Sequence, residues 1–351
     1  MAQQHLDPTD PTAGPAPTGD ALAGYLRAQA TEFLRALRLH RETGSGPGGT
    51  EEAVDAARAL RRSVRRISGS LHTFRPLLET DWSENLRPEL AWLSGTLSME
   101  HAYAARLDRL LLALHRLSGA AVFPAQSAGG PAPATRSDPA TAERGNLTVG
   151  AAKAGALLER QLTLARTRAH STALQALGSS RFHAVADKVA VLASEVPLTT
   201  TAARADLGPL AGAAQERLTD AVTGLPLVTA GHPYNAEALI HGLSPDPAPH
   251  PQDAPWHQVR LLLRLHRYSR EVLLGDNALV DVRLLDAGQA LNRHRDASEA
   301  AAAAASAART PRIAPATAYA LGVLHADQRH EVEGARFAFQ QAWQKQEVRA
   351  S

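Results

Sequence analysis

The stretch Trp256-His-Gln-Val-Arg-Leu-Leu-Leu-Arg-Leu-His-Arg-Tyr-Ser-Arg-Glu271 predicts an amphipathic helix. At roughly 100° per residue, one face carries a histidine, three arginines and a tyrosine: His257, Arg260, Arg264, Arg267 and Tyr268. The opposite face carries Val259, Leu262, Leu265 and Ser269. No acidic residue lies between Asp253 and Glu271, so the arginines of this segment have no acidic neighbour within it. We therefore expect one face to be buried and the other to hold anions.

A second segment, about 200 residues earlier in the chain, repeats this pattern. Arg58, Arg61 and Arg65 have the spacing of His257, Arg260 and Arg264, and Arg62, Arg66 and Arg75 add further charge. Again no acid lies between Asp55 and Glu79. A single such helix is commonly a solvated arginine face. Two of them favour a bound polyanion, because like charges stacked at helical spacing oppose the helix unless a ligand neutralises them.

Composition indicates a globular protein without thiol chemistry. The 351 residues are 44% apolar, which is enough for a core, and they include no cysteine, which excludes disulfides and thiolate zinc sites. The segment from Met1 to Asp20 has no apolar run, and no stretch approaches the length of a membrane-spanning helix. We therefore expect a soluble cytoplasmic protein. The formal net charge is only +2, so the distribution of charge matters more than its sum.

The apolar periodicity predicts an all-α fold, because nothing alternates with period two over a useful length. Helices are expected over about 20–41, 50–76, 83–117, 148–177, 181–194, 202–222, 256–271, 277–308 and 317–346. The connections are predicted to be a disordered tail over 1–19, a flexible turn over 44–49, a mobile loop over 123–146, and a crossover over 226–255 with a short turn near 236–243. Asn146-Leu-Thr matches a glycosylation pattern and is interpreted as part of the loop.

The helix order repeats, which predicts an internal duplication. A first half over about 20–177 and a second over about 203–348 would form two four-helix bundles related by a pseudo-twofold axis. Two weak matches support this: Ser94-x-x-Leu97-x-x-Glu100-His101 with Gly288-x-x-Leu291-x-x-His294-Arg295, and Gly155-x-Leu157 with Gly322-x-Leu324. Such an arrangement would bring the two basic helices towards one central face.

The second half resembles a known family. The run Trp256-His257-x-x-Arg260-x-x-x-Arg264-x-x-Arg267-Tyr268, followed by Gly288 and His294-Arg295-Asp296-Ala297, resembles the CHAD family, the conserved histidine α-helical domain. The likeness extends to Ser180-Arg181-Phe182 and to the helix from Ala316 to Trp343, so it covers about 20–348. The resemblance implies two four-helix bundles with a basic central surface that binds inorganic polyphosphate, often on polyphosphate granules, without catalysis.

The first half departs from the family pattern. In the register of the second half, Arg58 stands in place of the histidine, and Ser68 and Gly69 stand in place of Arg267 and Tyr268. The third helix of this half has His101-Ala102 where the family has Arg-Asp. Half of the expected site is therefore altered, which leaves open weaker binding, a different anion or a protein partner.

The predicted polyphosphate-binding residues are His257, Arg260, Arg264, Arg267, Arg58, Arg61, Arg65, Tyr268, His294 and Arg295. Guanidinium groups suit this task because they match phosphate oxygens two at a time. Alternatives remain for four of these residues. His257, beside an apolar stripe, could be a structural donor, and Tyr268 could be a core residue whose hydroxyl faces the site. Arg295, and similarly His294, could pair with Asp296 or a neighbouring carboxylate.

Neither a metal site nor a catalytic site is predicted. Asp327-x-x-His330 has the spacing of half a di-iron site, but such a bundle site needs a second copy and two further glutamates. Glycine-rich phosphate loops ending in Lys-Ser/Thr are missing, as is a Glu-x-Glu-x-Lys metal-triphosphate signature. We therefore expect no cofactor and no enzymatic activity.

Two other functions remain open. A helical scaffold could dock an acidic protein segment in a basic groove, which the altered first half would favour. RNA binding is ranked low, because only 4% of residues are aromatic and so few are available to stack on bases. We do not expect a membrane partner.

Overall fold

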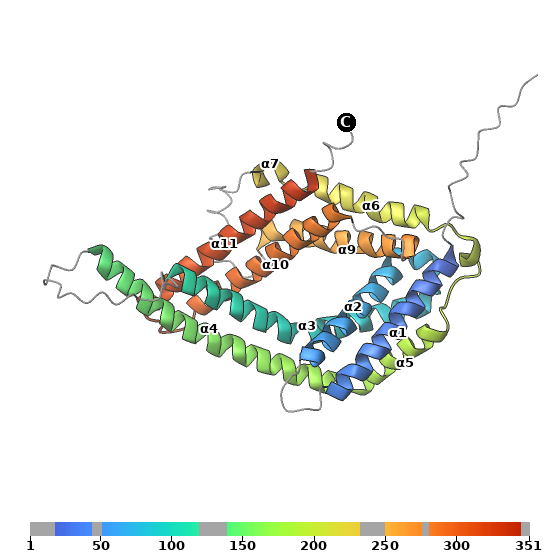
Figure 1. Ribbon diagram of the computed structural model, residues 1–351, viewed down its shortest axis with the longest axis horizontal. Coiled ribbons are helices and arrows are strands. Elements are labelled where there is room, and N and C mark those ends of the chain that lie inside the picture. The colour runs from blue at the N-terminus through green and yellow to red at the C-terminus, as the bar shows by residue number, and fades with distance from the viewer. Residues whose placement is uncertain (1–17, 44–50, 119–138, 232–249, 276–280, 345–351) are drawn as a thin grey trace, which may run out of the picture. The chain divides into compact units, whose positions relative to one another are not determined.

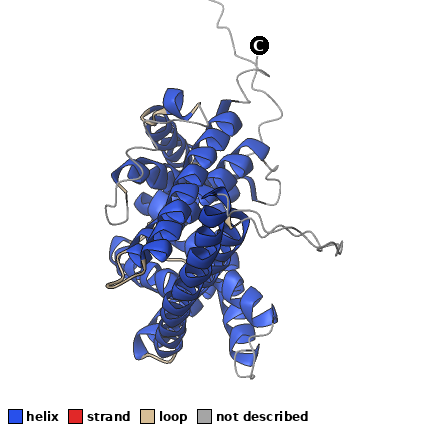
Figure 2. Cartoon of the chain, turned by 90° about the vertical axis from the view of Figure 1, so that its left-hand side faces the viewer, coloured by secondary structure: helices blue, strands red, loops and turns tan. Residues whose placement is uncertain are grey.

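The computed structural model describes residues 18–43, 51–118, 139–231, 250–275 and 281–344, and Figures 1 and 2 show these residues as helices with short connections. The long helices are α1 (Gly19–Thr43), α2 (Glu51–Thr73), α3 (Thr80–Leu117), α4 (Pro139–Leu177), α5 (Ser180–Ser194), α6 (Gly208–Thr223), α9 (Ala254–Leu274), α10 (Val282–Ala308) and α11 (Pro315–Gln344). The short ones are η1 (Arg75–Leu77), η2 (Ala202–Arg204), α7 (Leu227–Ala230) and η3 (Pro251–Asp253). Within the described ranges the extended pairing is one isolated bridge between Leu78 and Leu198. The predicted all-α fold is confirmed.

Local chemistry sets several helix starts. The hydroxyl of Ser179 accepts a hydrogen bond from the backbone nitrogen of Phe182, which caps α5. The carboxylate of Asp281 does the same for α10 by accepting from the nitrogen of Leu284 at 3.1 Å. Both caps satisfy donors that the first turn of a helix leaves without a partner.

Two predicted boundaries were wrong. Helix α4 begins at Pro139, so the expected loop ends earlier and Asn146 lies in a helix. Proline fits a first helical position because its missing N–H has no partner there in any case. The helix expected over 202–222 is broken into η2 and α6, where the carboxylate of Asp206 accepts from the nitrogen of Gly208 at 2.8 Å. This local bond offers the backbone an alternative to a continuous helix.

Some predictions concern segments outside the described residues. These are the tail over 1–17, the turn over 44–49, most of the loop over 123–146, the turn near 236–243 and the start of the helix expected at 277. The pseudo-twofold relation between halves is not shown, and the division into a first and a second half remains a prediction.

The chain divides into two compact units that interleave along the sequence. Unit 1 contains Met1–Ser94, Ser179–Leu218 and Arg264–Leu279. In unit 1, α1 packs against α2 and against α5 (Figure 1). Its core consists of fully buried side chains that recur at helical spacing: Leu22, Leu26, Phe33, Leu60, Val64, Ile67, Leu71, Phe182, Val185 and Val189. This buried face of α2 fixes which of its residues point outward.

Unit 2 contains Gly95–Gly178, Thr219–Leu263 and Val280–Ser351. Helices α4, α10 and α11 pack together over a core of alanine and leucine: Ala151, Ala154, Leu158, Ala300, Ala304, Ala307, Leu321 and Leu324. The small side chains let the helices approach closely. A Cβ at Gly150 would lie 2.2 Å from the carbonyl oxygen of Ala316, so the backbones of α4 and α11 meet directly at this point.

Candidate functional site

Two rows of basic residues were predicted, and each is called an arginine ladder here. The first, Arg58, Arg61 and Arg65, lies on α2. The second, His257, Arg260, Arg264 and Arg267, lies on α9. Leu60, Val64, Ile67 and Leu71 are completely buried and define the opposite face of α2. Arg58 is exposed, Arg65 is half-buried and Arg61 is the most deeply placed of the three, with 8% of its surface exposed. All three lie in unit 1.

Arg61 is a buried cation without a carboxylate. Its Nε donates to the carbonyl oxygen of Ala57 at 3.2 Å, and within the part of the chain that the structure describes no acid pairs with its guanidinium. Burial lowers the pKa of Arg61, and the neighbouring charges of Arg65 and Arg58 lower it further. A buried charge is costly unless an opposite charge or hydrogen bonds compensate it. An anion bound at this position would supply that compensation.

Arg58 corrects one sequence-based expectation. Its Nη1 lies 3.0 Å from the carboxylate of Asp55, which stands three residues before it on α2. Asp55 marks the boundary of the segment without acids that ends at Glu79, so its pairing with Arg58 was not predicted. Arg65 is placed differently, because its Nε donates to the hydroxyl of Ser94 on α3 at 3.4 Å.

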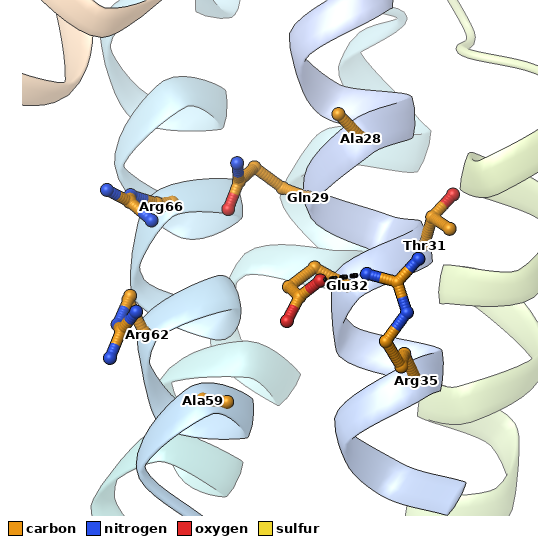
Figure 3. Close-up of a pocket in the computed structure, with 8 residues that line it drawn as sticks. All are labelled: Ala28, Gln29, Thr31, Glu32, Arg35, Ala59, Arg62 and Arg66. Atoms are coloured by element: carbon orange, nitrogen blue, oxygen red, sulfur yellow. Dashed lines mark hydrogen bonds and ion pairs between the residues drawn. The ribbon is translucent and has the colours of Figure 1, made fainter. Parts of the chain in front are cut away.

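The other arginines of α2 face α1 and line a separate pocket of about 480 Å³. Figure 3 shows Arg62 and Arg66 on one side, with Gln29 and Glu32 reaching towards them from α1. Glu32 pairs with Arg35 at 2.6 Å. Arg66 pairs with Glu271 of α9 at 2.8 Å, so acids balance much of the positive charge on this side of α2.

The second half of α9 lies beside α2 in unit 1. A Cβ built on Gly69 would lie 2.6 Å from Cδ2 of Tyr268, so the absence of a side chain at Gly69 admits the tyrosine ring. Glu271, which pairs with Arg66, also accepts a hydrogen bond from the hydroxyl of Tyr25 at 2.8 Å. Burial and the charge of Glu271 raise the pKa of Tyr25, which therefore remains a donor. Arg264 and Arg267 are half-buried on this part of α9.

The first half of α9 belongs to unit 2 and carries His257 and Arg260. The imidazole of His257 meets that of His294 edge to face, with centroids 5.5 Å apart. Burial is the main cause that lowers the pKa of His257; Arg260 and Arg295 lower it further, while Asp253 opposes the shift. Arg260 donates from Nε to the amide oxygen of Asn292 at 2.9 Å.

A buried ion cluster holds the start of α9, and the sequence analysis missed it. The carboxylate of Asp253, with no exposed surface, accepts hydrogen bonds from Arg329 at 2.7 Å and from Arg336 at 2.7 Å. The hydroxyl of Ser298 donates to the same carboxylate, and Glu333 pairs with Arg336 at 2.7 Å. The arginines interrupt the apolar stripe of α11 at positions one or two turns apart, which is the signal that could have identified them.

His294, a predicted polyphosphate contact, is part of this cluster. It is 1% exposed, its Nε2 accepts from Arg336 at 3.3 Å, and its ring stacks on Trp256 with centroids 5.6 Å apart. Burial, reinforced by Arg336, lowers the pKa of His294 to about 3, so the ring is neutral. The neutral, enclosed ring contributes to the packing of the cluster, and its contact with phosphate stays a prediction.

Arg295 forms the pair that the sequence allowed as an alternative. Its Nε donates to the carboxylate of Asp296 at 2.9 Å, and Glu299 lies 3.9 Å from the same nitrogen. The side chain of Arg295 is 32% exposed, but two acids already compete for its charge. It is a weaker candidate for an anion contact than Arg61.

Within the described residues, neither a metal site nor a membrane-spanning helix is found. Among them, no group of three or more histidine, cysteine, aspartate and glutamate residues is placed to hold a metal ion. None of the helices within the described ranges combines the length and apolar character needed to cross a bilayer.

Three chains among the solved structures are similar to this one, and two of them are described here. "PptA from Streptomyces chartreusis" is 73% identical, with a TM-score of 0.77, and the match covers 94% of this chain and 100% of that chain. The CHAD domain from the plant Ricinus communis is 15% identical, with a TM-score of 0.48, over 95% of this chain and 97% of that chain. No curated protein sequence matches this chain.

The family model for the CHAD domain matches residues 25–277. This range includes both arginine ladders and ends before the Gly288 to Ala297 segment. The matched range is well over half of the 351 residues, so the chain belongs to the CHAD domain family, a family of polyphosphate-associated proteins.

Proposed function

We propose that this protein binds inorganic polyphosphate, or a closely similar polyanion, through the basic faces of α2 and α9 and without catalysing a reaction. Arg61 and Arg65 are the principal contacts on α2, with Arg58 a weaker one because Asp55 competes for it. Arg264 and Arg267 are the contacts on the half of α9 that belongs to unit 1. His257 and Arg260 are taken by themselves as contacts of unit 2, on the earlier half of the helix. Tyr268 supports the α2 face by packing on Gly69.

Arg61 is the observation that carries this proposal. An arginine with 8% of its residue surface exposed and no carboxylate partner among the described residues is destabilising unless a ligand neutralises it. Only a slender anionic group can reach such a position, and a phosphate oxygen meets this condition better than a carboxylate held on a folded peptide. Family membership supports the same ligand.

The affinity for a polyanion should depend strongly on the salt concentration. Counterions that are condensed on a polyanion are released when arginines replace them, so affinity falls steeply with salt concentration. Binding through several arginines should therefore weaken by orders of magnitude between low and physiological salt. We also propose that the protein is cytoplasmic and associates with polyphosphate granules.

The test compares two neighbouring arginines on α2. We would titrate polyphosphate against the wild type, Arg61→Gln and Arg62→Gln by calorimetry at fixed salt. Arg61→Gln should weaken binding at least about tenfold, the effect of one lost charge-assisted hydrogen bond in a buried position. Arg62 is the matched control, because it is exposed and lines the pocket that faces α1.

Equal affinities for the two variants would contradict the assignment of Arg61. Competition identifies the ligand class: an acidic peptide that displaces polyphosphate at similar concentration would support the scaffold function instead. Displacement by RNA would favour nucleic-acid binding. A wild type that shows no binding of polyphosphate would refute the proposal as a whole.

A further inference from the structure

The anion-binding face of α2 continues beyond the predicted ladder. His72 lies two helical turns after Arg65, and the spacing places it on the same face as Arg61 and Arg65. From Arg61 to His72 the helix rises about 16 Å, at 1.5 Å per residue. Arg75 follows directly in η1. The stripe of basic residues is therefore longer than the sequence motif of the family suggested.

Helix α3 runs antiparallel beside this stripe in unit 1. Three contacts fix the register: Arg65 with Ser94 at 3.4 Å, His72 with Arg87 at 3.1 Å, and Arg75 with Glu84 at 3.0 Å. As the α2 position advances by a given number of residues, the α3 partner recedes by the same number. The two helices thus border a continuous strip of surface from Arg65 to Arg75, and Arg61 lies one turn before its start.

The middle of this strip carries small side chains. The same register places Ser68 of α2 opposite Ala91 of α3, between the contact of Arg65 with Ser94 and that of His72 with Arg87. Ser68 stands where the second basic helix has Arg267. A serine facing an alanine leaves the surface between the two basic clusters free of bulky groups, so an extended ligand can pass from one to the other.

The far end of the strip is a cluster with an excess of positive charge. One carboxylate oxygen of Glu84 accepts from both Arg75 and Arg87, each at 3.0 Å. Arg87 also donates from Nη2 to Nδ1 of His72, so that nitrogen carries no proton and the ring is neutral. Arg217 on α6 adds its field at His72. Three guanidiniums thus surround one acid and one neutral imidazole.

We infer that His72, Arg75 and Arg87 form a distal phosphate subsite, reached by a polyphosphate chain that is anchored at Arg61 and passes over Ser68 and Ala91. The inference rests on the proposed function and adds a length requirement to it. A ligand must span about 16 Å to touch both clusters, so a short polyphosphate binds the Arg61 end and a long chain binds both.

His72 makes the distal subsite sensitive to pH. Burial lowers the pKa of His72, and Arg87, Arg217 and Arg75 lower it further, while Glu84 raises it. A phosphate placed among these groups raises that pKa towards or above its ordinary value. Binding of a long chain therefore takes up a proton, and its affinity rises as the pH falls through this interval.

The experiment compares two ligands and four variants. Tripolyphosphate and a long polyphosphate chain would be titrated against the wild type, Arg61→Gln, His72→Gln, and the double variant His72→Gln with Arg87→Gln. Arg35→Gln is the matched control, since it removes an exposed arginine of unit 1 that also pairs with a glutamate. Circular dichroism would establish that each variant is folded.

The double variant should weaken the binding of the long chain roughly tenfold and leave the affinity for tripolyphosphate unchanged. Arg61→Gln should weaken both ligands. The wild type should bind the long chain more tightly at pH 6 than at pH 8. The single variant His72→Gln should lose this difference in affinity. If the double variant binds the long chain like Arg35→Gln, or loses both ligands equally, the distal subsite is refuted while the proposed function stands. A wild type that binds neither ligand refutes the proposed function itself.

Discussion

Replacing Asp253 by asparagine should destabilise unit 2 severely. Asp253 has no exposed surface and serves Arg329 and Arg336, which are 2% and 4% exposed. Asparagine keeps one acceptor oxygen but removes the charge, so Glu333 alone remains for two buried guanidiniums. Breaking a buried ion pair from one side costs about 3–5 kcal/mol, because the uncompensated charge stays buried. We expect a loss of this size.

Urea unfolding of the full chain, followed by tryptophan fluorescence, measures this loss. Trp256, one of the four tryptophans, is buried against Arg336 of the cluster. Asp296→Asn is the matched control in the same unit, because Asp296 pairs with Arg295 at a partly exposed position. Such a surface pair contributes at most about 1 kcal/mol. If Asp253→Asn lowered the free energy of unfolding by no more than Asp296→Asn, the buried cluster would not be the structural centre of α9 and α11.

Acid titration gives the same prediction a second test. Burial raises the pKa of Asp253, but hydrogen bonds and charge from Arg329 outweigh it and lower the pKa from its usual 3.8 to about 2. A carboxyl group with a lowered folded pKa stabilises the protein above its unfolded pKa and loses this contribution as the pH falls towards the folded value. The stability difference between wild type and Asp253→Asn should therefore be constant above pH 4 and shrink from pH 4 to pH 2.

Three further predictions concern single positions. His294→Gln should reduce the loss of stability in acid. In the unfolded chain His294 binds a proton near pH 6.5, whereas its pKa in the folded protein is about 3. The free energy of unfolding of the wild type, measured in urea, should therefore fall by about 2 kcal/mol between pH 6.5 and pH 5. Gly150→Ala should destabilise the protein by roughly 1–3 kcal/mol through overpacking and so lower its melting temperature. Gly155→Ala, whose added Cβ would have its nearest neighbour at 3.6 Å, should raise the melting temperature through helix propensity. Gly69→Ala should cost a similar 1–3 kcal/mol, and a double-mutant cycle with Tyr268→Leu should recover most of the loss.

The helices could be predicted from sequence because their buried faces are local patterns. The stripe of Leu60, Val64, Ile67 and Leu71 repeats every three or four residues, and each of these side chains is fully buried. The ladder of α2 follows from the same periodicity, since residues opposite a buried face must point outward. Arg61 could thus be selected, although its depth depends on neighbours from elsewhere in the chain.

The roles of several residues could not be predicted from sequence, because they depend on partners that are distant in the chain. His294 lies in a motif that resembles a binding site, but its burial depends on Arg336, which is 42 residues later, and on Trp256 of α9. In the sequence, Asp253 marks the boundary of a segment without acids. Its pairing with Arg329 and Arg336 depends on the packing of α11 beside it. The contact of Arg87 with His72 likewise requires that α3 return antiparallel to α2.

The departures of the first half from the family pattern have a packing explanation as well as a functional one. In the register of the predicted duplication, Gly69 and Tyr268 are equivalent positions, and the structure places them in contact, with 2.6 Å between the ring and a Cβ built on Gly69. When equivalent positions of two helices meet each other, both cannot carry an aromatic ring in the same space. Glycine at one then follows from tyrosine at the other, so this one departure needs no functional explanation. The polyphosphate affinity of Arg61→Gln is therefore the better measure of whether the predicted first half retains its site, because Arg61 lies about two turns before Gly69 and its Nε donates to Ala57.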